Sequence, residues 1–386
     1  MGLGRNTGSC LLYTSCHQRD NAPHRLKWTE RTVGAEHMPP FTGIYIFIFM
    51  KSDNFYEKAK RKTIAIVYIF EGEEAIGFEH YHVWESDIIA PWLLAVQQLH
   101  CIPLILDVRT FVEKAISNTL PKIDFVVNLN CGSTLLSSMP LVPSICSFIG
   151  IPCIPCDSYG IVTGENKKTS NILAKNAGFL VPADLNPSDK NGIYKPLNLG
   201  SSIGVHREFL SELNGEGIYQ EFIPGFDITI PMIYNPVKEE MDFMPTIIYI
   251  PESKDINWFL DEDYANPNNK FQRYIAHNLS DGLIQSCRKL AADINLNTFC
   301  RIDARLKKEH YDFDLELTEE NTYFLEINPM PTVSTENAFF HSYSAINEQD
   351  QIYESINKFR NIIGGDSVHA FVLWSSILSF YSHVQK

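Results

Sequence analysis

The chain has 386 residues, enough for two or three packed subdomains, and 45% of them are hydrophobic, an ordinary share for a globular protein. The formal net charge of −14 argues against nucleic acid as a partner, because a phosphate backbone is held mainly by an excess of Lys and Arg. A nucleotide ligand stays open, since a few local lysines and a metal ion can hold one.

No apolar run approaches the ~18 residues needed to span a bilayer, and the start of the chain lacks the basic and apolar regions of a signal peptide. We therefore expect no membrane partner and a cytoplasmic location. Residues 1–50 show no periodicity and are expected to be disordered or dispensable, with the functional polypeptide beginning near Met50. The nine cysteines include Cys153 and Cys156, which lack a second pair to complete a zinc site, so buried, reduced thiols are expected.

Residues 63–157 alternate between short apolar runs and segments of helix length. Strands are predicted at residues 62–70, 102–106, 125–129 and 151–154, and an amphipathic helix at residues 88–100. Strands that alternate with helices indicate a parallel sheet covered on both faces, so this region is predicted to be an α/β subdomain.

The next region combines a helix with a loop rich in Gly and Ser. Residues 163–176 have a helical pattern, and Gly178 marks its end. Residues 192–196 and 203–208 then predict a hairpin whose mobile tip is formed by residues 197–202.

The remainder of the chain mixes strands with fewer helices, and it shows no internal repeat. Strands are predicted at residues 218–222, 227–234, 246–250, 299–306 and 323–328, a helix at 281–294, and mainly helical structure over 345–386.

Four polar residues lie on two of these strands, in the order Arg301, Asp303, Glu326 and Asn328. Because strand side chains alternate between faces, each pair shares a face, and pairing of the two strands would bring three oxygen ligands together. Mg²⁺ prefers such hard oxygens, and an adjacent Arg could stabilise negative charge in a transition state. The alternative is a charged hairpin that faces solvent.

A loop after Lys195 contains Gly200, Ser201, Ser202 and Gly204. Its glycines allow close backbone approach, and successive loop amides and hydroxyls form an anion-binding concavity, with Lys195 placed to contact a phosphate. The alternative is an ordinary hairpin turn, since the loop matches neither a Walker A motif nor a dinucleotide-binding fingerprint.

Residues 219–227 form an apolar strand that ends in Pro-Gly, with Gln220 and Asp227 near its two ends. Such a strand suits an adenosine site in which Gln220 bonds the adenine edge, the backbone of Ile223 reads the ring nitrogens and Asp227 binds the ribose. The alternative is an edge strand followed by a turn.

Taken in order, these segments resemble the ATP-grasp superfamily and, within it, the D-alanine–D-alanine ligase-like group. The resemblance covers roughly residues 120–342. Its motifs lie at residues 150–152, 164–167, 194–205, 220–225, 301–303 and 325–329. The fold implied is α/β (α+β), with the N-terminal parallel subdomain followed by two ATP-grasp subdomains, residues 158–226 and 227–386, whose antiparallel sheets sandwich ATP.

The resemblance also implies roles for these residues. Lys167 and Lys195 would contact the ATP phosphates, Ser201 and Ser202 would cover the reaction centre as part of the lid, and Arg301 would stabilise the oxyanion. Catalysis would thus fall to Arg301 and Ser201.

The nucleotide and the metal would be held further along the chain. Adenine and ribose would be bound by Gln220 and Asp227, the backbone groups of Glu221 and Ile223 would line the slot, and two Mg²⁺ ions, with Mn²⁺ as an alternative, would be bound by Asp303, Glu326 and Asn328.

The activity implied is ATP-dependent joining of a carboxylate to an amine through an acyl phosphate, with small amino acids or other small molecules as substrates and a homodimer as a compatible assembly. Three alternatives are a specialised amino-acid or small-molecule ligase, an ATP-grasp enzyme that phosphorylates a different acceptor, and an inactive ATP-binding sensor.

The chain departs from the ligase pattern mainly where amino acids bind. Residues 71–77 lack the expected arginine, residues 128–132 replace a His-Gly segment, and the Lys-Tyr loop is not recognisable in residues 251–274. Ser334 and Asn337 can still supply hydroxyl and amide groups to a substrate carboxylate. The resemblance therefore supports the nucleotide half of the site more than the amino-acid half.

Overall fold

The computed structural model describes a large part of the chain: residues 61–69, 86–131, 139–186, 188–200, 202–207, 217–260, 270–312, 315–335 and 337–384. The chain divides into two units, Met1–Phe49 and Met50–Lys386, and every described residue belongs to the second. The predictions for residues 1–50, for residues 71–77 and for Ser201 therefore lie outside the described residues.

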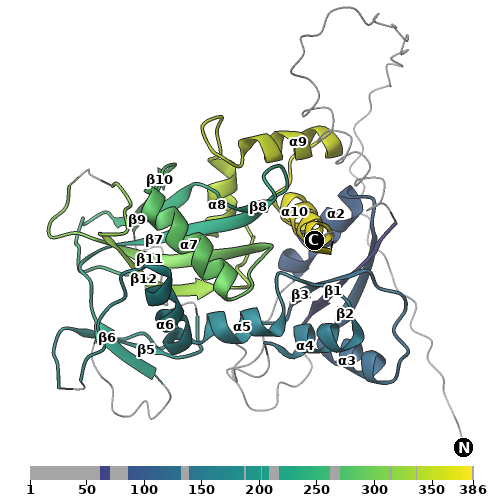
Figure 1. Cartoon of the computed structure of the whole chain (residues 1–386), viewed down its shortest axis with the longest axis horizontal. Helices are drawn as coiled ribbons and strands as arrows, with labels where there is room; N and C mark the ends of the chain where they lie inside the picture. Colours follow the sequence, from purple (N-terminus) through teal and green to yellow (C-terminus); the bar gives the residue numbers. More distant parts are fainter. Residues whose placement is uncertain are drawn as a thin grey trace, which may run out of the picture. The chain divides into compact units, whose positions relative to one another are not determined.

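The predicted parallel sheet is present, with strand order β2-β1-β3-β4. Its strands are β1 (Thr63–Tyr68), β2 (Ile102–Asp107), β3 (Phe125–Leu129) and β4 (Cys153–Ile154), and its helices are α2 (Ser86–Gln98), α3 (Val108–Ile116) and α4 (Leu141–Ile149). Alternate residues of β1 pack on opposite sides: Ile64 contacts the side covered by α2, and Ala65 the side covered by α3 and α4 (Figure 1). The strand expected at residues 151–154 shortens to two residues, since Pro152 and Pro155 flank it without backbone N–H groups.

The helix predicted over residues 163–176 is instead two helices, α5 (Ser158–Glu165) and α6 (Lys167–Ala177). Asn166 interrupts them with extended backbone angles, φ −83° and ψ 102°, and its side chain accepts the Thr169 N–H at 3.0 Å as an N-cap. Gly178 ends α6 in the left-handed region, as predicted.

The predicted hairpin is also different. Strand β5 (Gly192–Pro196) pairs antiparallel with β6 (Gly217–Glu221), whereas the described residues 202–207 contribute one isolated bridge, between Tyr194 and His206. Ser202 and Gly204 adopt φ values of 57° and 70°, so this stretch turns instead of extending as a strand.

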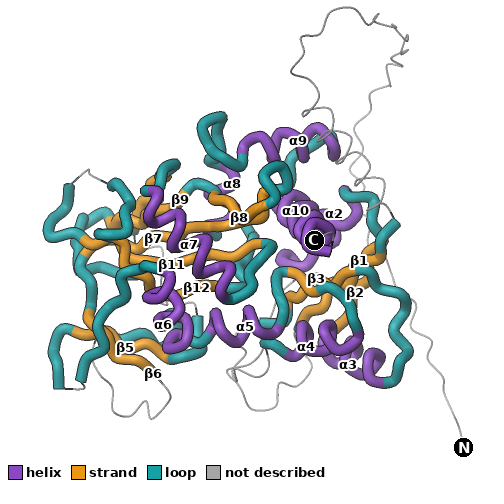
Figure 2. The backbone as a smooth tube through the Cα atoms, viewed as in Figure 1, coloured by secondary structure: helices purple, strands orange, loops and turns teal. Residues whose placement is uncertain are grey.

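A six-stranded antiparallel sheet follows, ordered β10-β9-β7-β11-β12 with β8 paired to β7. Its strands are β7 (Gly225–Asn235), β8 (Glu240–Phe243), β9 (Thr246–Pro251), β10 (Phe271–Ala276), β11 (Phe299–Lys307) and β12 (Thr322–Asn328). Helices α6 and α7 (Asp281–Asp293) cover its apolar face, where Leu283 and Leu290 meet Ile302 (Figure 2). The opposite face carries the polar residues.

The C-terminal segment is helical, as predicted: α8 (Ala338–Ser344), α9 (Tyr353–Ile363) and α10 (Val368–Val384). Among the described residues, no single helix is long and apolar enough to cross a membrane; α9 and α10 through Ser382 reach that length and composition only as a pair bent by 105°. The seven described cysteines are free and buried, which confirms that prediction for them.

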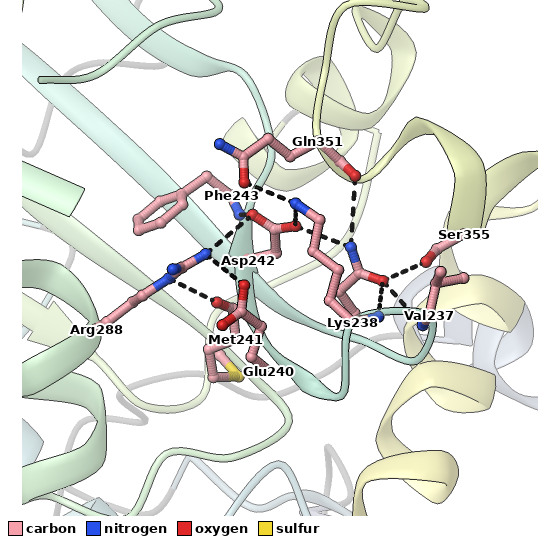
Figure 3. Close-up of polar contacts among 10 residues, drawn as sticks. Val237, Lys238, Glu240, Met241, Asp242, Phe243, Arg288, Gln351 and Ser355 are labelled. Atoms are coloured by element: carbon pink, nitrogen blue, oxygen red, sulfur yellow. Dashed lines mark hydrogen bonds and ion pairs between the residues drawn. The ribbon is translucent and has the colours of Figure 1, made fainter. Parts of the chain in front are cut away.

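A buried polar cluster ties the turn between β7 and β8 to the neighbouring helices (Figure 3). Asp242, which is fully buried, accepts from the Asn235 amide at 2.8 Å and pairs with Lys238 at 3.0 Å and Arg288 of α7 at 3.7 Å. The Ser355 hydroxyl of α9 donates to Asn235 at 2.5 Å. Asp242 thus connects α7 to the sheet, and Asn235 connects α9 to it.

Together the three sheets fall in the three segments that the sequence separates, and the antiparallel pair of sheets matches the predicted fold class. The subdomain boundaries at residues 157 and 226 stay a prediction.

Candidate active site

The prediction that Arg301, Asp303, Glu326 and Asn328 converge is confirmed by strand pairing. Arg301 lies opposite Asn328 and Asp303 opposite Glu326 in the β11–β12 ladder. Directly opposed residues point to the same face of a sheet, and the intervening Ile302 is fully buried on the other face. The side chains of Arg301 and Asp303 are only 20% and 16% exposed, which excludes a solvent-facing charged hairpin.

Arg301 and Asp303 form a closely held ion pair. The Nε and Nη2 atoms of Arg301 donate to one Asp303 oxygen at 3.0 and 2.8 Å, and the Thr229 hydroxyl donates to the other at 2.6 Å. Burial opposes the positive charge of Arg301, but Asp303 outweighs it and holds the pKa of the guanidinium above its ordinary value.

Lys167 reaches the same face from the first residue of α6. Its Nζ lies 2.9 Å from a Glu326 oxygen and 2.5 Å from the carbonyl of Leu199. Leu199 belongs to the predicted loop tip at residues 197–202, called the lid segment below. Burial acts to raise the pKa of Glu326, but Lys167 and then Arg301 outweigh it and hold that pKa below its ordinary value. The break at Asn166 starts a new helix at Lys167, and this places the lysine beside β12.

Lys195 on β5 is buried, and its Nζ has no hydrogen-bond partner among the described residues. Burial, helped by Lys167, lowers the pKa of Lys195 to about 8. A buried ammonium without a partner is unfavourable unless a ligand supplies the missing anion. This atom therefore fits the phosphate contact that the sequence predicts.

These residues line one cavity of about 400 Å³, within the size range of ligand pockets. It lies between β5–β6, the lid segment and the polar face of the six-stranded sheet, and its polar lining includes Glu165, Lys167, Lys195, Ser202, Glu221, Asp227, Arg273, Arg301, Asp303, Glu326, Asn328 and Asn337. The structure thus brings most of the predicted site residues to one place.

Asp227 faces the cavity, but its carboxylate already accepts hydrogen bonds from other residues of the protein. It accepts from Arg305 at 2.8 Å and from the Leu260 N–H at 2.7 Å. Arg305 also donates to the carbonyls of Ile223, Gly225 (3.0 Å) and Trp258 (2.6 Å). Asp227 therefore helps to hold the wall of the cavity, and the Ile223 carbonyl is not free for a ligand.

Gln220 does not line the cavity, in contrast to its predicted contact with adenine. Its amide nitrogen donates to the Pro182 carbonyl at 3.2 Å and to Asp184 at 3.4 Å. Its neighbour Glu221 and Ile223 do line the cavity. The side chain of Gln220 thus connects β6 to the segment after α6.

The structure gives contacts for Ser202 of the predicted lid and for the predicted substrate residues Ser334 and Asn337. Ser202 lines the cavity and donates to the Leu260 carbonyl at 2.8 Å, which joins the lid segment to the loop held by Arg305. Asn337 lines the cavity, and its amide donates to the Ser334 hydroxyl at 2.6 Å. Ser334 itself lines a separate, smaller cavity of about 20 Å³.

The predicted metal ligands offer two carboxylates and one amide oxygen. Among the described residues, no group of three His, Cys, Asp or Glu side chains could hold a metal ion without other donors. Mg²⁺ usually takes one or two carboxylates and completes its shell with phosphates and water, so Asp303, Glu326 and Asn328 fit a metal that arrives with a nucleotide.

Several cavity residues were missed by sequence reasoning. Arg305 continues the alternation of Arg301 and Asp303 along β11, and this period of two would have placed it on the same face. Thr229 and Tyr249 come from strands recognised only as apolar runs, and Arg273 from a segment without a clear pattern. Glu165 lies inside the motif at residues 164–167, where only the lysine was considered.

Comparison with known proteins finds the same architecture in solved structures. No family model and no curated protein matches this sequence. The VanG D-Ala:D-Ser ligase from Enterococcus faecalis is 16% identical, with a TM-score of 0.53 over 83% of this chain and 100% of that one. D-alanine–D-alanine ligase from Bacillus anthracis complexed with ATP is 13% identical, with a TM-score of 0.53 over 84% and 99%.

A third structure, D-alanyl-alanine synthetase A from Vibrio cholerae O1 biovar eltor str. N16961, is 14% identical, with a TM-score of 0.52 over 79% of this chain and 99% of its own. At such identities the likeness concerns the arrangement of the elements. The parallel sheet, the two antiparallel sheets and the cavity between them give this chain the ATP-grasp fold, as its sequence predicts.

Proposed function

We propose that the protein is an ATP-dependent ligase that joins a carboxylate to an amine through an acyl phosphate. The observation that carries the proposal is the single cavity in which the unpartnered ammonium of Lys195 faces the Arg301, Asp303, Glu326 and Asn328 surface. A phosphate site and a carboxylate-rich metal site in one cavity suit phosphoryl transfer, where positioning and charge neutralisation provide most of the acceleration.

When bound, ATP with Mg²⁺ supplies the phosphoryl group that converts an inert carboxylate into a reactive acyl phosphate. Lys195 and Lys167 bind the phosphates, and Asp303, Glu326 and Asn328 hold the metal. Lys167 is paired with Glu326 at 2.9 Å in the structure, so it would exchange that carboxylate for a phosphate oxygen. Arg301 then stabilises the negative charge of the tetrahedral intermediate.

The substrates are proposed to be small amino acids or other small carboxylates and amines. A pair of D-alanine molecules is the first pair to test, given the ligases named above. A specialised ligase is the second candidate, because residues 128–132 and 251–274 differ from the D-alanine ligase pattern at the amino-acid positions.

The proposal is tested by ADP release, mass spectrometry of products and hydroxylamine trapping. The protein is incubated with ATP, Mg²⁺ and a mixture of L- and D-amino acids, with an EDTA-treated sample and Glu326→Gln as controls. We expect metal-dependent ADP release, a condensation product, and a hydroxamate when hydroxylamine is present. Tight ATP binding without ADP release would indicate a sensor, and a phosphorylated product without hydroxamate would indicate another acceptor.

A further inference from the structure

Glu165, the last residue of α5, is held at the end of β12 by a close helix contact. A Cβ atom added to the preceding Gly164 would lie only 3.1 Å from the Pro329 ring, directly after Asn328. Glu165 is half-buried and lines the cavity, and Lys167, Glu326 and Arg301 are the charged groups that act on it. The carboxylate therefore lies near the end of β12 that carries Glu326 and Asn328.

Glu165 differs from the other carboxylates around it. Asp227, Asp303 and Glu326 each pair with a cation at 2.8 to 2.9 Å. Glu221 also lines the cavity, but it is exposed on β6. Glu165 has no hydrogen bond or ion pair with any described residue, so its charge faces the cavity uncompensated.

The nearby cations do not neutralise Glu165. The Nζ atom of Lys167 is bound to Glu326 and to the Leu199 carbonyl, and Arg301 is bound to Asp303. Burial raises the pKa of Glu165 to about 7, Lys167 and Arg301 oppose that rise, and Glu326 adds to it. Lys167 and Arg301 therefore attract the carboxylate of Glu165 without pairing with it.

Two ordinary roles for a carboxylate at this position leave its oxygens available to a ligand. Glu165 ends α5, where the helix dipole disfavours a negative charge, and it precedes the N-cap of α6, where a negative charge is favourable, but it accepts no hydrogen bond from either helix. As for the metal, Asp303 and Glu326 already offer the one or two carboxylates that Mg²⁺ usually takes, so the proposed metal site does not require Glu165. A cationic group on a ligand in the cavity can therefore supply the ion pair that the described residues do not.

We propose that Glu165 binds the ammonium group of the amine substrate and positions its nitrogen for attack on the acyl phosphate. This inference rests on the proposed ligase function. In the step that follows, the ammonium first releases one proton to solvent, and the nitrogen lone pair freed in this way forms the C–N bond as the C–O bond to phosphate breaks. The acyl phosphate and R′NH₃⁺ become an amide, HPO₄²⁻ and one released proton.

The test compares a charged with an uncharged nucleophile on the same acyl phosphate. Hydroxylamine is uncharged at neutral pH and needs no carboxylate partner, whereas the amino acids of the mixture carry ammonium groups. The wild type, Glu165→Gln, Glu165→Asp and the exposed control Glu320→Gln are each incubated with ATP, Mg²⁺ and the amino-acid mixture, with and without hydroxylamine. Peptide and hydroxamate are quantified by mass spectrometry, and nucleotide binding and melting temperature check the fold.

We expect Glu165→Gln to lower peptide formation about ten- to hundredfold, the worth of one hydrogen bond to a charged group, while hydroxamate formation stays within about twofold. Higher amino-acid concentrations should recover part of the loss, because the Michaelis constant for the amine rises more than the turnover number falls. Glu165→Asp should keep part of the activity, and Glu320→Gln should match the wild type.

An equal loss of peptide and hydroxamate in Glu165→Gln, or no loss of either, overturns the ammonium site. A wild-type protein that forms no hydroxamate and no peptide instead overturns the proposed ligase function, and the ammonium site with it. The two failures are therefore distinguished by the wild-type sample.

Discussion

The strand pair β11–β12 and the segment at residues 220–227 were predicted with the same reasoning but meet different outcomes. On β11–β12, the four polar side chains face one cavity, as the alternation predicts. Along residues 220–227, Asp227 faces the cavity but is bound to Arg305, and Gln220 bonds the Pro182 carbonyl outside it.

The difference lies in what each prediction requires. Alternation along a strand gives the face on which a side chain lies, and pairing of two strands brings those faces together. It does not say which polar atoms remain free, because this depends on residues far away in sequence. Arg305 is 78 residues from Asp227, and Pro182 is 38 residues from Gln220.

The largest effect is expected on the β11–β12 side of this comparison. Glu326→Gln should lower ADP release about thousandfold, because a metal ligand and the anion that faces Lys167 are lost together. The melting temperature should change little, since Glu326 lies on a polar, partly exposed face. Glu320→Gln is the exposed control. Activity within about tenfold of the wild type would show that Glu326 binds no metal.

The other side of the comparison is tested by Arg305→Met. This change removes the partner of buried Asp227 and one donor to each of the carbonyls of Gly225 and Trp258. Breaking a buried ion pair by removing one partner typically destabilises by about 3–5 kcal/mol, which urea unfolding would measure. A loss below about 1 kcal/mol would show that Asp227 is available to a ligand rather than committed to Arg305.

The fold could be predicted to the extent that it depends on local pattern. The buried strand β1, the alternation of strands and helices before residue 157, and the amphipathic α7 follow from periodicity. The errors occur where a single residue changes the backbone. Asn166 divides one predicted helix by capping the second, and Gly204 turns the strand predicted at residues 203–208 with its positive φ.

The candidate site likewise contains residues that the sequence places and residues that only the structure identifies. Lys167 and Lys195 could be placed near the polar strands from motif order, and both line the cavity. Glu165 and Arg305 could not be recognised as functional without the structure, because their importance depends on which neighbours are already paired. A single sequence contains no direct record of such pairings.

Lys195 gives a smaller effect on stability, and its size depends on pH. Its pKa of about 8 lies below the ordinary 10.5, so at pH 7 the fold buries a charge at a cost of about 3 kcal/mol. Between pH 8 and 10.5 the unfolded chain binds more protons than the fold, and the wild type therefore gains stability as pH rises. Lys195→Met should be more stable at pH 7 without nucleotide, and this advantage should shrink by pH 10.

Urea unfolding at the two pH values measures that change, and ATP with Mg²⁺ provides the matched condition. The nucleotide should stabilise the wild type more than Lys195→Met, because the variant lacks the ammonium that pairs with the phosphate. If Lys195→Met were no more stable than the wild type at pH 7, the ammonium would already have a partner in the fold.

The smallest effect is expected for Gln220, and it tests whether this side chain contacts adenine. Gln220→Leu keeps a similar volume and removes an amide whose oxygen is buried without a partner, so stability should change by less than about 1 kcal/mol. If the amide only connects β6 to the Pro182 segment, the dissociation constant for ATP should change less than about threefold. A tenfold weaker binding would show that Gln220 turns toward adenine when the nucleotide enters. The predicted adenosine contact would then depend on a side-chain movement, whereas the polar face of β11–β12 is already formed by strand pairing.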